Sequence, residues 1–154
     1  MPAYFLDSSG AVKKYVRETG TGWVISLFRQ KPANVFYVAE ITAAEVASAR
    51  ARRLRGLSLT AKQAGQAKKR FRRDFEEKFF RIEIDTQIIQ KAEELAEKHF
   101  LRAYDAVQLA AALKADADRT AVGGSKLIFV CADNALRLAA SAEGLAVEDP
   151  NAHP

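Results

Sequence analysis

Short apolar runs alternate with longer stretches of helical periodicity along the whole chain. The apolar runs have the length of strands and fall near residues 3–7, 35–39, 79–84, 126–131 and 145–148. The intervals between them carry apolar residues at helical spacing, over about 9–18, 21–30, 41–55, 58–77, 85–98, 103–117 and 134–142. This alternation predicts an α/β fold with a central, mainly parallel, five-stranded sheet.

The length and composition favour one domain in a reducing compartment. A chain of 154 residues can bury one substantial core, so we expect a single domain over residues 1–150 and a frayed tail over 151–154. The lone Cys131 excludes a disulfide framework, and the N-terminus lacks the pattern of a secretory signal. No apolar run reaches membrane-spanning length. We therefore expect a cytoplasmic protein that does not enter a membrane.

Four carboxylates stand where a solvated charge is least expected. Asp7 and Asp133 each follow directly on an apolar strand. Glu45 and Asp105 align with the apolar stripes of predicted helices. In a parallel sheet, ligands collect beyond the carboxyl ends of strands where the strand order reverses, so these acids can converge if the first and fourth strands are neighbours.

Converging carboxylates favour a hard divalent cation. Oxygen-only donor sets suit Mg²⁺ and Mn²⁺, whereas zinc more often recruits the His and Cys side chains that this chain barely contains. Two carboxylates about 5 Å apart repel by about 3 kcal/mol at an effective dielectric constant of about 20. A bound cation would relieve this repulsion and could activate water for attack on a phosphodiester.

Each acid also has a purely structural interpretation. Asp7 and Asp133 precede predicted helices and could be N-caps, while Asp105 could be a first-turn acid that complements the helix dipole. Glu45 could be an exposed helix residue. Other catalytic schemes are poorly supplied, because His99 and His153 lie near no recognisable nucleophile and no phosphate-binding glycine loop is present.

The basic residues are clustered between the second and third strands. The chain carries a formal charge of +5, and no acid occurs from Val46 through Arg73. Dense positive charge of this kind favours phosphate contact over a merely solvated helix face. The candidates for contact with RNA are Arg50, Arg52, Arg53, Arg55, Lys68, Lys69, Arg72 and Arg73.

The motifs, taken in order, resemble the PIN-domain ribonucleases, and specifically the toxin half of VapBC-type toxin–antitoxin pairs. The resemblance covers nearly the whole chain. Each motif is short and modestly specific, but their order and spacing match together. They are Tyr4–Ser9 with the helix that follows, Ile41–Val46, Leu101–Ala110, Phe129–Asp133 with its helix, and Gly144–Pro150.

The resemblance implies a three-layer α/β/α fold and an endoribonuclease activity that depends on Mg²⁺ or Mn²⁺. It maps Asp7, Glu45, Asp105 and Asp133 onto the family's catalytic, metal-binding acids. It also implies a homodimer that a cognate antitoxin inhibits. Ser8 or Ser9 would support Asp7 or contact the substrate, although a local turn hydroxyl is an equal alternative.

Cys131 departs from the family pattern, in which Thr or Ser is common two positions before the fourth acid. A thiol hydrogen-bonds weakly, so Cys131 would support the fourth acid less firmly than Thr or Ser does. The sequence therefore leaves open whether Asp133 binds the metal directly or is peripheral. The sequence also leaves open the RNA target, the number of metal ions and the identity of the antitoxin. A non-catalytic nucleic-acid or protein-binding module and a structure-specific DNA nuclease are the alternative functions.

Overall fold

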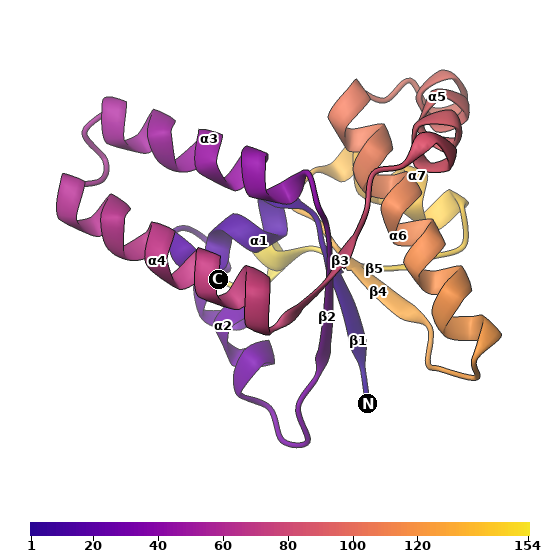
Figure 1. Cartoon of the computed structure of the whole chain (residues 1–154), viewed down its shortest axis with the longest axis horizontal. Coiled ribbons are helices and arrows are strands. Elements are labelled where there is room, and N and C mark those ends of the chain that lie inside the picture. Colours follow the sequence, from indigo (N-terminus) through magenta and orange to yellow (C-terminus); the bar gives the residue numbers. More distant parts are fainter.

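The computed structural model describes residues 1–154, and its elements alternate as the sequence predicts (Figure 1). The strands are β1 (Ala3–Leu6), β2 (Val35–Ala39), β3 (Phe79–Ile82), β4 (Leu127–Val130) and β5 (Ala146–Glu148). The helices are α1 (Ser8–Tyr15), α2 (Thr21–Arg29), α3 (Thr42–Arg55), α4 (Ala61–Glu77), α5 (Thr86–His99), α6 (Ala103–Ala121) and α7 (Asn134–Ala142), followed by the 3-10 helix η1 (Pro150–Ala152).

The five strands form one sheet in the order β3-β2-β1-β4-β5, and every neighbouring pair is parallel. The chain starts in the middle strand, β1, crosses over to one edge through β2 and β3, and later returns to build the other side through β4 and β5. The order therefore reverses between β1 and β4, where Leu6 is in register with Val130. The first and fourth strands are therefore neighbours, which is the condition under which the acids at their ends can converge.

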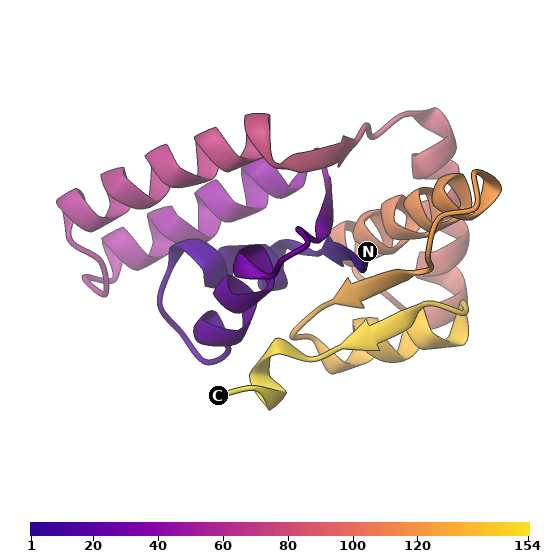
Figure 2. The ribbon, with the colours of Figure 1, turned by 90° about the horizontal axis from the view of Figure 1, so that it is seen from below.

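The side chains of β1 alternate between two cores, which makes the protein three-layered. Phe5 packs with Phe129 under α5, α6 and α7, whereas Tyr4 and Leu6 face α1, α2 and α4 on the other side. Figure 2 shows the two helical layers on opposite sides of the strands. The sheet is thus buried on both faces, as its continuously apolar strands predict. No helix is both long and apolar enough to cross a bilayer.

The helix boundaries follow local capping signals. Thr60 and Gln63 form a reciprocal capping box that starts α4, and the side chain of Asp85 accepts from the amide of Ile88 at the start of α5. Gly56 ends α3, as expected for the break between two helices. Helix α6 continues to Ala121 rather than ending at residue 117.

The C-terminal segment is ordered, contrary to the expectation that residues 151–154 fray. Pro150 is buried at the start of η1, and the ring of His153 stacks on that of Trp23 with their centroids 4.4 Å apart. Gly20 (φ +86°) makes this packing possible, because a Cβ there would stand 2.2 Å from the carbonyl oxygen of Pro150. No pattern in the sequence indicates this contact, which joins two distant segments.

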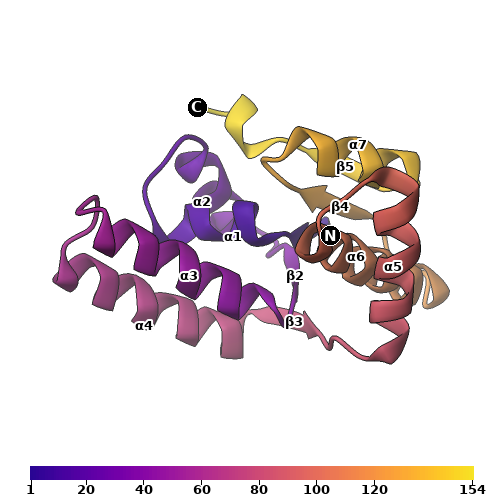
Figure 3. The same ribbon diagram turned by 90° about the horizontal axis from the view of Figure 1, so that it is seen from above.

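Helices α3 and α4 form a hairpin that projects from the sheet, as Figures 1 and 3 show. Its attachment to the core includes Asp74, whose side chain is fully buried and contacts Lys14, Tyr15 and Lys78. Burial alone would raise the pKa of Asp74, but the hydrogen bond and charge of Lys14, with help from Tyr15 and Lys78, outweigh it and lower the pKa. Asp74 is therefore a buried anion that ties the hairpin to α1.

We predict that Asp74→Ala destabilises the protein by about 3 kcal/mol, because removing one partner of a buried pair leaves Lys14 without its counter-charge. Urea unfolding followed by circular dichroism measures this loss. Asp118→Ala, at an exposed acid of α6, is the matched control and should change stability by less than about 0.5 kcal/mol. A loss as small as that of the control would show that the pair is not a structural tie.

Candidate active site

The ends of β1 and β4 place Asp7 and Asp133 on either side of the reversal in strand order. The amide of Asp7 donates to the carbonyl of Val130 at 3.2 Å, so the two strand ends are joined directly. Both acids are also N-caps. Asp7 Oδ1 accepts from the amide of Gly10, and Asp133 Oδ1 accepts from the amide of Leu136, each at 2.8 Å. The capping interpretation is correct for both residues, yet each cap engages only Oδ1 and leaves Oδ2 for other contacts.

Helices α3 and α6 bring Glu45 and Asp105 to the same end of the sheet. Gln108, buried one turn after Asp105, donates to Thr42 Oγ1 at 2.9 Å and to Glu45 Oε2 at 3.5 Å. The other oxygen, Glu45 Oε1, is buried without any hydrogen-bond partner. Leaving a buried carboxylate oxygen without a partner costs free energy. A bound cation would supply the partner that Glu45 Oε1 lacks.

The pKa values of three of these acids are raised. Burial is the largest cause for Asp7, Glu45 and Asp105, and neighbouring carboxylates add to it in each case. The charge of Asp105 raises the pKa of Asp7, and the charge of Asp133 raises the pKa of Asp105. The charges of Asp7 and Asp105 together raise the pKa of Glu45. The four predicted acids therefore form one electrostatically coupled group, which resists being fully ionised.

A guanidinium partly neutralises the open side of this group. Arg102 Nε lies 3.3 Å from Asp105 Oδ2, and its Nη2 lies 3.9 Å from Asp133 Oδ2. The Arg102 side chain is 82% exposed, so its charge is strongly screened and the interaction is weak. Arg102 offsets part of the burial effect on the pKa of Asp105.

The donor set fits a hard cation, although the acids do not form a finished cage. With the side chains as they stand, no three or more His, Cys, Asp or Glu residues are grouped so that they could hold a metal ion. The fit rests on the carboxylate chemistry, the mutual repulsion and the unpartnered Glu45 Oε1. A cation would have to draw these oxygens together against the exposed Arg102.

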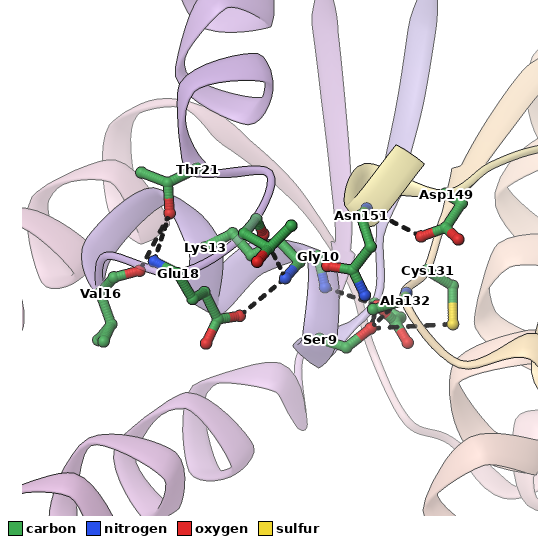
Figure 4. A network of polar contacts seen from close by, with 12 residues as sticks. Ser9, Gly10, Lys13, Val16, Glu18, Thr21, Cys131, Ala132, Asp149 and Asn151 are labelled. Atoms are coloured by element: carbon green, nitrogen blue, oxygen red, sulfur yellow. Dashed lines mark hydrogen bonds and ion pairs between the residues drawn. The ribbon is translucent and has the colours of Figure 1, made fainter. Parts of the chain in front are cut away.

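Ser9 and Cys131 contact Asp7, and Figure 4 shows the contacts of Ser9 with Cys131 and Ala132. Ser9 Oγ donates to Asp7 Oδ1 at 2.6 Å and accepts from the amide of Ala132 at 2.9 Å, so it links the loops after β1 and β4. Cys131 Sγ accepts from the amide of Asp133 at 3.3 Å. Burial and the charge of Asp7 raise the pKa of the Cys131 thiol, which stays protonated. Ser8 lies beside Glu45 and offsets part of the rise in the pKa of that carboxyl.

A groove of about 1060 Å³ runs along α3 and opens at Glu45, the one of the four acids that lines it. Ser8, Glu45, Arg102 and Tyr104 line the end next to the sheet, and Arg52 and Arg53 line the end that lies further along the helix. The groove thus joins the acidic group to positive charge. This arrangement suits a ligand that carries several phosphates.

The predicted basic residues divide into groove-lining and outlying ones. Arg52 and Arg53 line the groove, whereas Arg50 and Arg55 on α3 do not. The basic residues of α4 lie outside it too: Arg72 pairs with Glu76, Arg73 lies beside Asp74, and Lys68 and Lys69 are exposed. Charge density in the sequence could not separate these groups, because the α3–α4 hairpin presents several faces.

Arg102 and Gln108 were missed as site residues. Each stands three residues from Asp105, on one side or the other, and residues at this spacing share a helix face. That spacing was the available signal. The buried position of Gln108 and its contact with Thr42 depend on how α6 packs against α3, which the sequence does not show.

The fold and the acids at its switch point define a class of protein: a parallel α/β domain with a carboxylate site where the strand order reverses. Residues 4–140 match the model of the PIN domain family. The chain belongs to this family, as the motifs indicate.

The similar sequences include two ribonucleases from Mycobacterium tuberculosis. These are Ribonuclease VapC45 of strain CDC 1551 / Oshkosh and Ribonuclease VapC49 of strain ATCC 25618 / H37Rv. Each is 30% identical to this chain over 154 residues, which is the whole of both proteins.

The similar solved structures include a toxin–antitoxin complex. FitAcB from Neisseria gonorrhoeae has a TM-score of 0.61 at 18% identity, covering 96% of this chain and 97% of that one. A toxin–antitoxin complex from Klebsiella pneumoniae has a TM-score of 0.60 at 17% identity, with 96% and 97% covered. At these identities the likeness shows the fold, and it confirms the three-layer α/β/α prediction.

We predict that Asp7→Asn stabilises the metal-free protein at neutral pH. A carboxyl whose pKa is raised by folding destabilises the folded state once it ionises, so stability falls as pH rises above the unfolded-state pKa of about 4. Asn keeps the acceptor for Gly10 and Ser9 but not the charge. Thermal unfolding in EDTA should show a melting temperature about 3 °C higher at pH 7, with the gain vanishing near pH 4.

Asp118→Asn removes an exposed acid and should show no such gain. A less stable Asp7→Asn variant at pH 7 would mean that the cap outweighs the repulsion.

Proposed function

We propose that the protein is a metal-dependent endoribonuclease and the toxin component of a toxin–antitoxin pair. The observation that carries the proposal is the coupled group of acids, with Asp7 buried, the other three half-buried and Glu45 Oε1 unpartnered, at the end of a groove lined by arginines. The relatives named as ribonucleases support the choice of RNA as substrate. Hydrolysis of a phosphodiester needs little beyond a positioned water and stabilised negative charge, which matches a site without catalytic histidine.

Asp7, Glu45, Asp105 and Asp133 would hold Mg²⁺ or Mn²⁺. When bound, the metal lowers the pKa of a water and stabilises charge on the phosphate oxygens. Asp133 is the most exposed of the four, with its side chain 40% accessible, and its Oδ1 is committed to the cap. It therefore suits a peripheral role, while the buried Asp7 and the half-buried Glu45 are the principal ligands in this proposal.

The other residues position these acids and the RNA. Ser9 and the amide of Gly10 fix one oxygen of Asp7, and Gln108 fixes one oxygen of Glu45, so the remaining oxygen of each is free for the metal. Arg102 stands at the mouth of the site, where it would meet a phosphate that approaches Asp105. The groove arginines guide the RNA backbone.

The neighbours solved as toxin–antitoxin complexes support an antitoxin partner, which would act by covering the site. A homodimer is part of the same proposal. Exposed apolar side chains are available for such contacts, among them Phe100, Leu57 and Val122, each at least 85% exposed. The cytoplasm, where RNA is present, is the proposed location.

A non-catalytic binding module is the second candidate. It is favoured by the fact that Asp7 and Asp133 each cap a helix, which is a structural role sufficient to explain both residues. In that case the acids would be structural, and the basic groove alone would bind nucleic acid or a protein. Such binding would be independent of metal and would weaken steeply with salt.

The deciding experiment incubates purified, antitoxin-free protein with structured RNA, single-stranded RNA and DNA in Mg²⁺, Mn²⁺ or EDTA. We expect metal-dependent cleavage of RNA that falls by at least about 100-fold in Asp7→Asn and in Glu45→Gln, because each change removes a metal-binding charge from the site. Circular dichroism verifies that both variants fold.

The matched control is Asp118→Asn, which should cleave at the wild-type rate. Cleavage retained in both site variants contradicts the assignment of the acids. Binding without cleavage in every metal supports the binding module, and cutting of DNA alone supports a DNA nuclease.

A further inference from the structure

The floor of the groove is one face of α3 that carries only small side chains between its two ends. Ser48 and Ala49 lie between Glu45 and Arg52 on α3, Ala44 directly precedes Glu45, and all three line the groove. No large side chain interrupts this face. A polymer backbone can therefore lie close to the helix over the whole distance from the acids to the arginines.

The length of this floor sets how many nucleotides it spans. Arg52 follows Glu45 by seven residues, which corresponds to about 10 Å along a helix axis. A stacked strand advances about 3.4 Å per phosphate, so the arginines lie about three nucleotides from the acids. A more extended strand would reach them in fewer.

The far end of the groove already holds a carboxylate. Glu18, in the loop between α1 and α2, pairs with Arg53 of α3 and, through Oε1, with Lys13 Nζ at 3.0 Å (Figure 4 shows the contact with Lys13). Lys13 is 4% exposed, so this anion compensates a buried cation. Arg52 is exposed at the same end, and its Nη1 donates only to Ser48 Oγ, at 2.7 Å.

We propose that this far end is a second phosphate-binding site, which takes a backbone phosphate of single-stranded RNA about three nucleotides from the cleaved bond. The carboxylate of Glu18 occupies it in the free protein and is displaced from Arg53 by the RNA phosphate. A phosphate offers Arg52, Arg53 and Lys13 the same kind of charged acceptor that Glu18 offers now. The inference rests on the proposed function for the identity of the ligand.

Lys13 keeps one of its two contacts in this exchange, and the incoming phosphate takes over the charge pairing that Glu18 provides now. Its Nζ also donates to the carbonyl of Thr19 at 2.7 Å, so the Lys13 side chain remains held when Glu18 moves. Glu18 is 23% exposed and can turn toward solvent. The carboxylate of Glu18 thus competes with the RNA phosphate for Arg53. It changes the affinity for RNA rather than the rate of the cleavage step.

The test compares Glu18→Gln with wild type on two RNA substrates, one reaching a single nucleotide beyond the cut on each side and one reaching six. We expect Glu18→Gln to lower KM for the long RNA by about fivefold, the equivalent of one surface ion pair, and to leave the short RNA unchanged. Binding of the long RNA, measured in the Asp7→Asn background, should gain about 0.7 in the steepness of its salt dependence.

Arg52→Gln is the complementary variant, because it leaves the contacts of Lys13 untouched. It should raise KM for the long RNA about fivefold without changing kcat. A neutral methylphosphonate placed at each position of the long RNA in turn should abolish the Glu18→Gln effect at one position, about three nucleotides from the cut on one side. Arg29→Gln and Glu97→Gln, at exposed helix positions away from the groove, should match wild type.

Equal effects on short and long RNA, or no position sensitive to the neutral linkage, would overturn this site while leaving metal-dependent cleavage intact. Tight binding of an acidic peptide with no effect of Glu18→Gln on RNA would overturn it in favour of a protein partner. Conversely, the expected binding pattern in the Asp7→Asn background without any cleavage by the wild type supports the phosphate site and contradicts the nuclease.

Discussion

Carboxylates crowded at the carboxyl edge of the sheet, with Asp7 buried and the other three half-buried, are the constraint on which the rest of this structure depends. Parallel strands end at one edge of the sheet, and the strand order reverses between β1 and β4, so Asp7 and Asp133 meet there whatever the chemistry they perform. Burial raises the pKa of Asp7 and Glu45 further. A domain of this size has only about 5 to 15 kcal/mol of net stability, so such a cluster must be offset by caps, by Arg102 or by a cation.

The α3–α4 hairpin connects this acidic edge to positive charge. Its buried tie, Asp74, holds α4 against α1, and α3 then presents Glu45 at its first turn and its arginines further along. One rigid helix therefore fixes the spacing between the acids and the basic end of the groove. A rigid element positions such groups more accurately than a loop does, which favours a defined path for a polyanion.

Local signals in the sequence predicted the elements and the acids, and tertiary packing decided the rest. Strand-length apolar runs and caps such as Asp85 are local, so the order and type of every element followed from them. Which arginines line the groove depends on the rotation of α3 against α1, and the ordered tail depends on Trp23 meeting His153. Neither contact leaves a periodic trace in the sequence, and the same is true of the packing that brings Gln108 to Glu45.

The helix caps and the proposed metal ligands are the same residues because each carboxylate has two oxygens. Asp7 uses Oδ1 for Gly10 and Ser9, which anchors the side chain so that Oδ2 has a fixed direction. Capping thus provides the preorganisation that a metal site needs, and the two interpretations of the sequence are compatible. Ser9, the amide of Gly10 and Cys131 all contact the carboxylate of Asp7, whereas Cys131 meets Asp133 only at its backbone, so the chain places its firmest support behind the first acid rather than the fourth.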